Sequence, residues 1–274
     1  MFGRQLDLFS GAGVPAADDA TATPEPPRLA PSALDDMTLA ATLLTARLAD
    51  CRALCAEVGR RRLATAVPAL EGLCRRFKGF GLEHAVSEQI AALSALTAIS
   101  APEAAAAVAR VIVDGVVQGP ELRDAVDAAV HLGCRLPPAI SVTLLRHNNA
   151  QVRAAACRCT RPHSEVMPLL VELLDDLHRP VAVAAGCALG RAGRIEARPM
   201  LARLLHDQPT EEVIDAVSAV ADEDCIVQLG RIARINPALS AAAFNALDLI
   251  DDPRARVVIA AVRKPASRGW VLVC

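Results

Sequence analysis

Aromatic side chains are scarce in this chain of 274 residues, which has no tyrosine, five phenylalanines and one tryptophan. β-Sandwiches and β-barrels bury many aromatic and β-branched residues, so this scarcity argues against an all-β fold. Alanine and leucine are instead abundant, with 55 and 34 copies. Both are strong helix formers, and alanine allows helices to pack closely. The composition therefore predicts an all-α protein, long enough for one large or two small domains.

The chain also has no large excess of charge of one sign, because it has 29 basic and 31 acidic residues and a formal net charge of −2. Any contact with nucleic acid must therefore be made by a local patch. Lysine is nearly absent, since Lys78 and Lys264 are the two lysines among the basic residues. Arginine and alanine codons are GC-rich and lysine codons are not, so we expect a bacterial source.

Long apolar runs are missing as well, and no window reaches about 18 uncharged apolar residues. Asp7 interrupts the N-terminal apolar residues where a signal peptide needs an unbroken stretch. Nine cysteines are scattered along the chain, without two pairs at a familiar metal-ligand spacing. We expect reduced thiols in a cytoplasmic protein, with no membrane contact, no metal and no other cofactor.

The chain divides by composition into a tail and a helical region. Residues 10–33 are rich in Pro, Ala, Thr and Asp and show no apolar period, so residues 1–33 are predicted to form a disordered tail. From Leu34 onward apolar residues recur at helical spacing between breaker residues, which predicts successive short helices over 34–264. Residues 265–274 leave this pattern as a C-terminal cap or frayed end. One helix start is predicted at Ser100, a capping hydroxyl with Glu103 three residues on.

An internal repeat organises the helical region. EVMPLLVELLDD at Glu165–Asp176 and EARPMLARLLHD at Glu196–Asp207 share Glu, Pro, Leu, Leu-Leu and a final Asp at a separation of 31 residues. An Ala-rich helix precedes each copy, starting near Val152 and Val181. Alanine in the first helix permits close approach, and leucine in the second fills the layer. Because each pair must bury its face against the next, the repeat predicts an α-solenoid.

The segment Val181–Asp207, VAVAAGCALGRAG followed by ARPMLARLLHD, resembles the HEAT-repeat family. Within that family, the chain is more similar to the HEAT-like repeats named after the phycobilisome lyases. This resemblance covers about residues 85–262. The resemblance implies an α-solenoid of HEAT-like helix pairs. Since most members are binding scaffolds, it also implies a non-enzymatic protein whose concave face binds a second protein.

Two enzymatic branches of that family are alternatives, namely a DNA repair glycosylase and a bilin lyase. A glycosylase of this type is expected to have a basic groove with aromatic residues and a carboxylate. The repeats hold Phe77, Phe80 and Phe244, with Trp270 beyond them. The six histidines have no paired carboxylate or serine at a suggestive spacing, so no catalytic residues are assigned.

The N-terminal pentapeptide Gln5-Leu6-Asp7-Leu8-Phe9 resembles the clamp-binding motif of bacterial replication and repair proteins, Gln-Leu-(Ser or Asp)-Leu-Phe, at all five positions. The resemblance implies an extended peptide that places its Leu and Phe side chains in an apolar cleft of the DNA sliding clamp. The Gln amide would form hydrogen bonds at the rim of that cleft. We therefore expect recruitment to the clamp, in DNA replication or repair.

Two other interpretations of the tail remain open. Residues 6–13, LDLFSGAG, also resemble motif I of the cytosine-C5 DNA methyltransferases, but the chain has no Pro-Cys dipeptide and no Glu-Asn-Val. In the second interpretation Phe2, Leu6, Leu8 and Phe9 fold back onto the first helices. The protein would then be a general interaction adaptor with no clamp role.

A local basic stretch is the candidate for nucleic-acid contact. Between Val58 and Leu82 six basic residues face one acidic residue, Glu71. Side chains of this kind bind DNA phosphates, although arginines at helix ends also cap backbone carbonyls. The six residues are Arg60, Arg61, Arg62, Arg75, Arg76 and Lys78.

Overall fold

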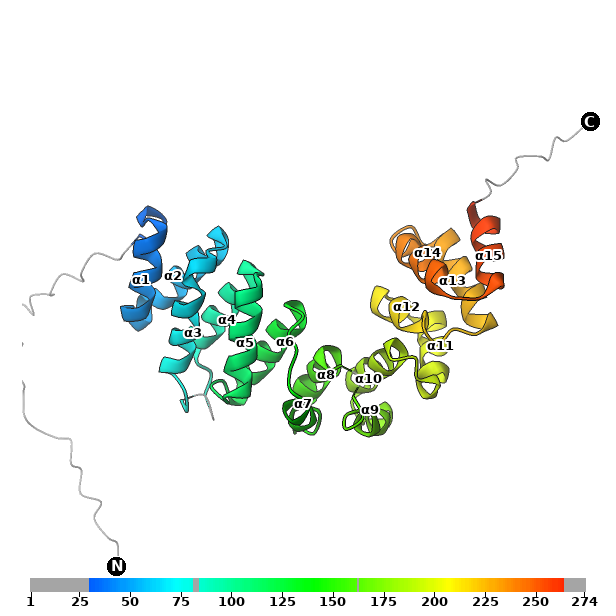
Figure 1. Cartoon of the computed structure of the whole chain (residues 1–274), viewed down its shortest axis with the longest axis horizontal. Helices are drawn as coiled ribbons and strands as arrows, with labels where there is room; N and C mark the ends of the chain where they lie inside the picture. Colours follow the sequence, from blue (N-terminus) through cyan, green and yellow to red (C-terminus); the bar gives the residue numbers. More distant parts are fainter. Residues whose placement is uncertain (1–29, 81–83, 162, 264–274) are drawn as a thin grey trace, which may run out of the picture. The chain divides into compact units, whose positions relative to one another are not determined.

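A computed structural model describes residues 30–80, 84–161 and 163–263. The predicted N-terminal tail with the pentapeptide Gln5–Phe9 and the predicted C-terminal cap or frayed end fall almost entirely outside these residues. The described helices belong to one unit of the chain, which begins at Pro31. Within the described residues the regular elements are helices throughout, which confirms the predicted all-α repeat fold (Figure 1).

The α-helices form two layers that alternate along the chain. In the even-numbered layer each helix contacts the next one along the row. Its members are α2 (Leu48–Arg61), α4 (Ser87–Ile99), α6 (Leu122–His131), α8 (Ala150–Cys159), α10 (Arg179–Arg191), α12 (Glu211–Val217) and α14 (Ser240–Leu249). The odd-numbered layer consists of α1 (Asp36–Thr45), α3 (Val67–Arg76), α5 (Pro102–Val113), α7 (Pro138–Leu145), α9 (Met167–Glu172), α11 (Arg198–Asp207), α13 (Glu223–Ile235) and α15 (Pro253–Arg263).

Short 3-10 turns connect several of these helices. They are η1 (Pro31–Ala33), η2 (Ala64–Ala66), η3 (Gly119–Glu121), η4 (Leu173–Asp175) and η5 (Ile195–Ala197). The two aligned repeat segments become α9 with η4 and η5 with α11. Pro168 and Pro199 lie in the first turns of α9 and α11, where no backbone N–H is needed for a helical hydrogen bond. The repeat unit read from the sequence is therefore a real helix pair.

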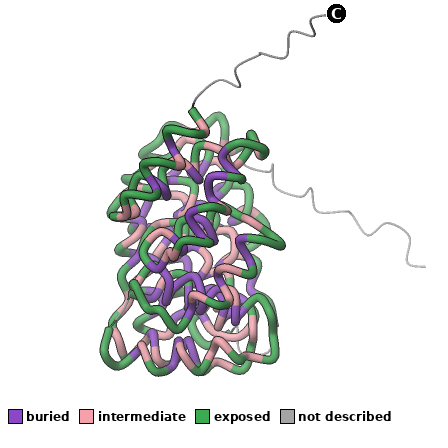
Figure 2. The backbone as a smooth tube through the Cα atoms, turned by 90° about the vertical axis from the view of Figure 1, so that its right-hand side faces the viewer, coloured by how far each residue is buried: buried purple, intermediate pink, exposed green. Residues whose placement is uncertain are grey.

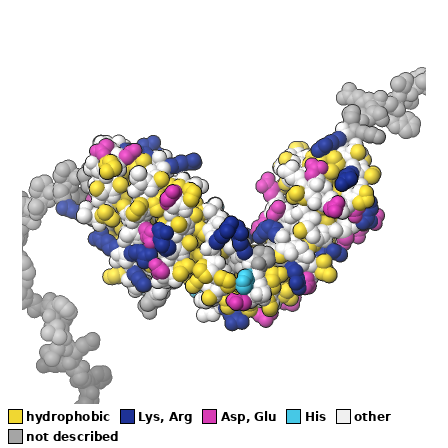
Figure 3. Space-filling model, viewed as in Figure 1, with side chains coloured by type: hydrophobic (Ala, Val, Ile, Leu, Met, Phe, Trp, Pro, Cys, Tyr) yellow, Lys and Arg dark blue, Asp and Glu magenta, His cyan; other side chains and the backbone are white. Residues whose placement is uncertain are grey.

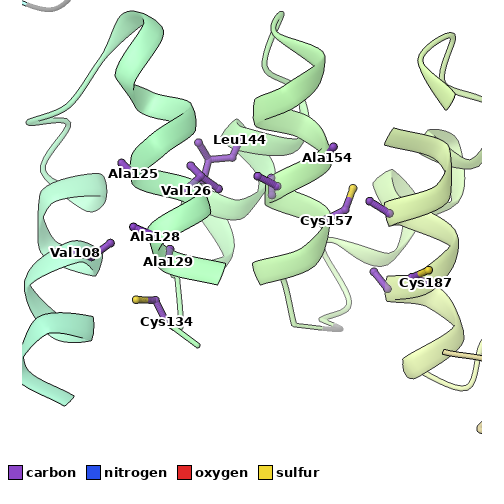
Figure 4. Packing of buried hydrophobic residues seen from close by; sticks show 14 of the residues in the cluster. Val108, Ala125, Val126, Ala128, Ala129, Cys134, Leu144, Ala154, Cys157 and Cys187 are labelled. Carbon is purple, nitrogen blue, oxygen red and sulfur yellow. The ribbon is translucent and has the colours of Figure 1, made fainter. Parts of the chain in front are cut away.

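The core lies between and within the layers, and buried positions recur along every repeat (Figure 2). The even-numbered layer contributes small side chains, such as Ala125 and Ala129 of α6 and Cys157 of α8 (Figure 4). Fully buried leucines come from both layers, for example Leu96 of α4 and Leu201 of α11. Small residues bring the even-numbered helices close together, and leucines fill the space toward the odd-numbered layer.

The predicted helix start at Ser100 is wrong in detail. The helix α5 begins at Pro102, its N-cap is Ala101, and no side chain caps it. Ser100 instead ends α4 in the left-handed conformation, with φ of 53°. Because proline is favoured in the first turn of a helix, Pro102 sets the start of α5 and leaves Ser100 to the preceding turn.

Two glycines inside α10 differ in what surrounds them. A Cβ atom on Gly190 would lie 2.5 Å from Leu201 Cδ1 and 2.6 Å from the backbone oxygen of Ala216. A Cβ atom on Gly186 would lie 3.0 Å from Sδ of Met200, the flexible end of a side chain. Only the first position brings α10 against the backbone of α12.

We predict that Gly190→Ala lowers the free energy of unfolding by about 1–3 kcal/mol, because the backbone of α12 must shift to admit the methyl group. The matched variant Gly186→Ala should be neutral or stabilising by up to about 1 kcal/mol, because Met200 can move and alanine favours the helix. Urea unfolding followed by circular dichroism measures both. Equal effects of the two substitutions would contradict the close packing of α10 on α12.

Candidate partner-binding groove

A groove lies between α2 and α4, with a volume of about 650 Å³. The two helices approach closely, since a Cβ atom on Gly59 would lie 3.3 Å from Cα of Ala95. Much of the lining is exposed to solvent, including Arg52, Ala56 and Ser94. The lining residues are Arg52, Cys55, Ala56, Gly59, Arg60, Arg62, Ser87, Ile90, Ala91, Ser94, Ala95 and Ala98.

A smaller hollow of about 270 Å³ continues the groove toward the N-terminal ends of the two helices. It shares Arg52 and Ser87 with the larger one and adds Leu48, Ala49 and Glu88. We call the two hollows together the α2/α4 groove. It follows the 14 residues of α2, and at a rise of 1.5 Å per residue it is about 21 Å long.

The α2/α4 groove combines an apolar floor with a basic rim. Ala56, Ala91, Ala95 and Ala98, together with Ile90, supply the floor. Figure 3 shows hydrophobic side chains gathered over the N-terminal helices, with Lys and Arg side chains around them.

Three arginines and one carboxylate set the charge of the groove. Arg60 pairs with Glu57 at 2.7 Å. Within the part of the chain that the structure describes, Arg52 and Arg62 form no ion pair, and Glu88 is the one carboxylate in the lining. An exposed apolar groove with free cations suits a ligand that is both apolar and anionic.

Arg61 lies beside the groove and fixes the beginning of the described chain. Its Nη1 donates to the backbone oxygen of Leu34 and to the carboxylate of Asp36, both at 2.8 Å. Its Nη2 donates to the backbone oxygens of Pro31 and Ser32 at 3.3 and 3.1 Å. The guanidinium fork thus fastens residues 31–36 to α2, which only arginine can do at several acceptors at once.

Glu57 completes this junction. Its carboxylate accepts hydrogen bonds from Arg60 and from Arg61, whose Nε lies 2.6 Å from Oε1. These hydrogen bonds, first that of Arg60 and then that of Arg61, lower the pKa of Glu57 to about 2. Glu57 therefore stays ionised across the neutral range and keeps both arginines in place.

The other basic candidates gather at the C-terminal end of α3. Arg75 pairs with Glu71 at 2.8 Å, Arg76 donates to the backbone oxygen of Ala46, and Lys78 donates to another backbone oxygen. The six predicted residues thus form two groups, at the ends of α2 and α3. Because five of them already have partners in the fold, less of their charge faces outward than the sequence implies. Contact with DNA stays a prediction.

The sequence indicated Arg60 and Arg62 but not the other residues of the groove. The missed signal is the spacing of small residues on two helices of the same layer. Ala56 and Gly59 on α2 lie three apart, and Ala91, Ala95 and Ala98 on α4 lie at spacings of four and three. Such spacing places small side chains on one helix face, which favours close approach.

One thiol, that of Cys55, lines the groove, and it is not reactive. Cys55 is fully buried at the floor, and burial raises its pKa to about 12. Burial likewise raises the pKa of Cys74 to about 12. All eight cysteines of the described ranges are free. A thiol that stays protonated at neutral pH is a poor nucleophile, so Cys55 acts as a small apolar residue.

Two further kinds of feature are absent from the described residues. No three side chains among His, Cys, Asp and Glu lie close enough together to hold a metal ion there. Among the helices of the same residues, none combines the length and apolar character that crossing a membrane requires.

Comparison with known families identifies the repeats. Residues 138–221, from α7 to beyond α12, match the family model described as HEAT repeats. This part of the chain is thus similar to HEAT repeats, the kind of repeat that the sequence predicted. No curated protein matches the chain. The α2/α4 groove lies N-terminal to the matched residues.

We predict that Arg61→Lys loosens the junction at residues 31–36, because a lysine cannot reach the carboxylates and the backbone oxygens together. Hydrogen exchange of the amides in residues 32–39 should quicken by roughly tenfold. Arg62→Lys is the matched control, since the neighbouring arginine has no ion pair in the described residues. Equal exchange in the two variants would show that Arg61 does not hold this segment.

A second prediction concerns alkaline pH. Buried thiols such as Cys55 and Cys74 keep their protons up to about pH 12 in the folded state, whereas unfolded thiols lose theirs near 9. The folded state thus binds more protons between these values, and stability should fall as pH rises, by about 1.4 kcal/mol per pH unit for each such thiol.

The chain suits this measurement because it has no tyrosine and two lysines, so few other groups titrate in that window. Urea unfolding at intervals from pH 8 to 11 measures the slope. Cys55→Ala should make the slope shallower than in the unsubstituted protein. A stability that does not change over this range would contradict the burial of the thiols.

Proposed function

We propose that this protein is a non-enzymatic interaction scaffold that is recruited to the bacterial DNA sliding clamp. The pentapeptide Gln5–Phe9 would bind the clamp, and the helical repeats would bind a second protein. The observation that carries the scaffold role is the match of residues 138–221 to HEAT repeats, together with the continuous layer of even-numbered helices. A surface built from repeated helix pairs is a common platform for protein partners.

The chemistry of the α2/α4 groove supports binding over catalysis. Its floor consists mostly of alanines, and its one thiol, Cys55, is buried and protonated. Its cations lie at the rim, where they can select an anionic partner. We therefore assign the described surface to recognition.

The clamp role rests on the residue pattern of the pentapeptide. Burying Leu6, Leu8 and Phe9 in an apolar cleft would contribute roughly 4–8 kcal/mol before the cost of ordering the peptide. The net affinity is then weak to moderate and the contact reversible. A scaffold with such a motif would bring its second partner to sites where the clamp encircles DNA.

The test is binding of the full chain to the sliding clamp of the same organism, measured by isothermal calorimetry. We predict that Leu8→Ala combined with Phe9→Ala weakens binding by roughly 100-fold or more, since two anchoring side chains are lost. Val14→Ala combined with Leu29→Ala is the matched control and should bind like the unsubstituted chain. Absence of binding by the unsubstituted chain would end the clamp proposal and leave the scaffold role intact.

A further inference from the structure

We propose that the α2/α4 groove binds an amphipathic helix of a partner protein, whose apolar side covers the alanine floor and whose acidic side chains face Arg52 and Arg62. The inference rests on the proposed scaffold role and deepens it, since it names the binding site and the chemistry of the second partner. Its basis is independent of the clamp, and consists of the packing, the exposure and the charges of the groove.

The helix pair α2 and α4 already carries helices on one of its sides. There α1 packs on α2, and α3 packs on α4. The lining of the groove comes from α2 with its C-cap Arg62 and from α4. On α2, Leu54 and Val58 are fully buried in the core, whereas Ala56 lines the groove and is exposed. The groove therefore opens on a side of the pair that α1 and α3 do not cover.

The two helices run parallel along the groove. At one end Leu48, the first residue of α2, lines the same hollow as Ser87 and Glu88, the first two residues of α4. Toward the other end Gly59 of α2 faces Ala95 of α4. Two parallel helices in close contact leave a straight groove between them. Its length of about 21 Å equals about four turns of an α-helix.

The small side chains of the floor determine which apolar side chains can fill the groove. Ala56, Ala91 and Ala98 fill little space themselves, so an occupant must supply large apolar side chains. An amphipathic helix presents such side chains on one face, at spacings of three and four residues. Laying that face into an apolar groove is a common mode of peptide recognition.

The openness of the groove favours a helix over a small molecule. Ala56, Ser94 and Ala98 are exposed, and they lie along the length of the groove. Pockets for small molecules bury most of the ligand surface. An amphipathic helix needs only one covered face, because its other face is polar and remains in water.

The charges of the groove indicate acidic side chains on one flank of this helix. Arg52 and Arg62 lie on the α2 side, ten residues apart, and neither forms an ion pair within the described residues. Ten residues of helix span about 15 Å. Two carboxylates about three turns apart on the partner helix would therefore complement both arginines. Glu88, on the α4 side, disfavours acidic side chains on the opposite flank.

The floor also favours a protein partner over DNA. Phosphates bind to cations and to hydrogen-bond donors, and the alanine floor between Arg52 and Arg62 supplies neither. Covering alanine side chains is favourable when the covering groups are apolar. An acidic amphipathic helix meets both requirements of the groove, apolar area and negative charge.

Binding of designed helical peptides to the full chain tests the proposal without any clamp. The probe is a fluorescent peptide of about 15 residues, with leucine at every third or fourth position and glutamate on one flank. A control peptide carries lysine in place of each glutamate. In fluorescence polarisation the glutamate peptide should bind roughly tenfold or more tightly than the lysine peptide. Absence of binding by the glutamate peptide, or equal binding of the two, would overturn the proposal.

Charge reversals in the chain locate the binding. Arg52→Glu combined with Arg62→Glu should weaken binding of the glutamate peptide by roughly tenfold or more and strengthen binding of the lysine peptide. Arg203→Glu combined with Arg231→Glu is the matched control, because both residues are exposed, lie on α11 and α13, and change the net charge equally. Equal effects of the two double variants would show a response to net charge alone and would overturn the proposal.

A pair of single substitutions tests the floor at constant charge. Ala56→Glu places a carboxylate on the floor and should weaken binding of the glutamate peptide by roughly tenfold or more. Ala53→Glu is the matched control, since Ala53 is exposed on the same helix and does not line the groove. Circular dichroism and thermal unfolding verify that each variant folds. Equal affinities of the two variants would exclude the floor as the contact.

Two results would assign the groove to another occupant and overturn the proposal. The first is tighter binding of duplex DNA than of the glutamate peptide, lost when Arg52 and Arg62 are both replaced by glutamate. The second is a dimer of the chain in analytical ultracentrifugation that the same substitutions abolish.

The calorimetry with the clamp separates this inference from recruitment. Peptide binding in the groove without any clamp binding would support the inference and refute recruitment. Clamp binding without peptide binding would refute the inference and support recruitment.

Discussion

The close approach of helices within the even-numbered layer is the constraint on which the rest of the structure depends. It is made possible by small residues at the contacts, as where Gly59 faces Ala95 and where Gly190 faces the backbone of α12. A chain with few aromatic side chains cannot fill wide gaps, so its layers must be thin and its helices close. The α2/α4 groove is a consequence, because small side chains that permit contact also leave a shallow floor beside it.

Arginine side chains hold the segments next to the helices in place through hydrogen bonds and ion pairs. Arg61 joins residues 31–36 to α2 through carboxylates and backbone oxygens. Arg153 of α8 does the same further along, with Nε and Nη2 at 2.9 and 3.0 Å from the carboxylate of Asp176, which is only 7% exposed. Such forked pairs are directional, so they fix where a turn lies as well as holding it. Much of the basic charge is thereby used within the fold.

The sequence predicted the fold well because the repeat is visible in it. The aligned copies at Glu165–Asp176 and Glu196–Asp207 revealed helix pairs without any knowledge of their neighbours. The prediction of a helix start at Ser100 was wrong, because Ser100 ends α4 and Pro102 sets the start of α5. The sequence also failed to identify Arg52 and the alanine floor of the groove. Periodicity shows which face of a helix is apolar or small, whereas the distance between two helices decides whether that face is covered.

The layered order of the helices has a consequence for how the protein unfolds. Each helix contacts mainly its neighbours along the row, so an end helix is held from one side only. At the C-terminal end α15 packs on α13 and α14 alone among the described helices with extensive contacts. Local unfolding should therefore begin at the terminal helices and proceed inward along the row. The repeats matched to HEAT models lie in the interior of this row, and they would keep their structure after the terminal pairs have opened.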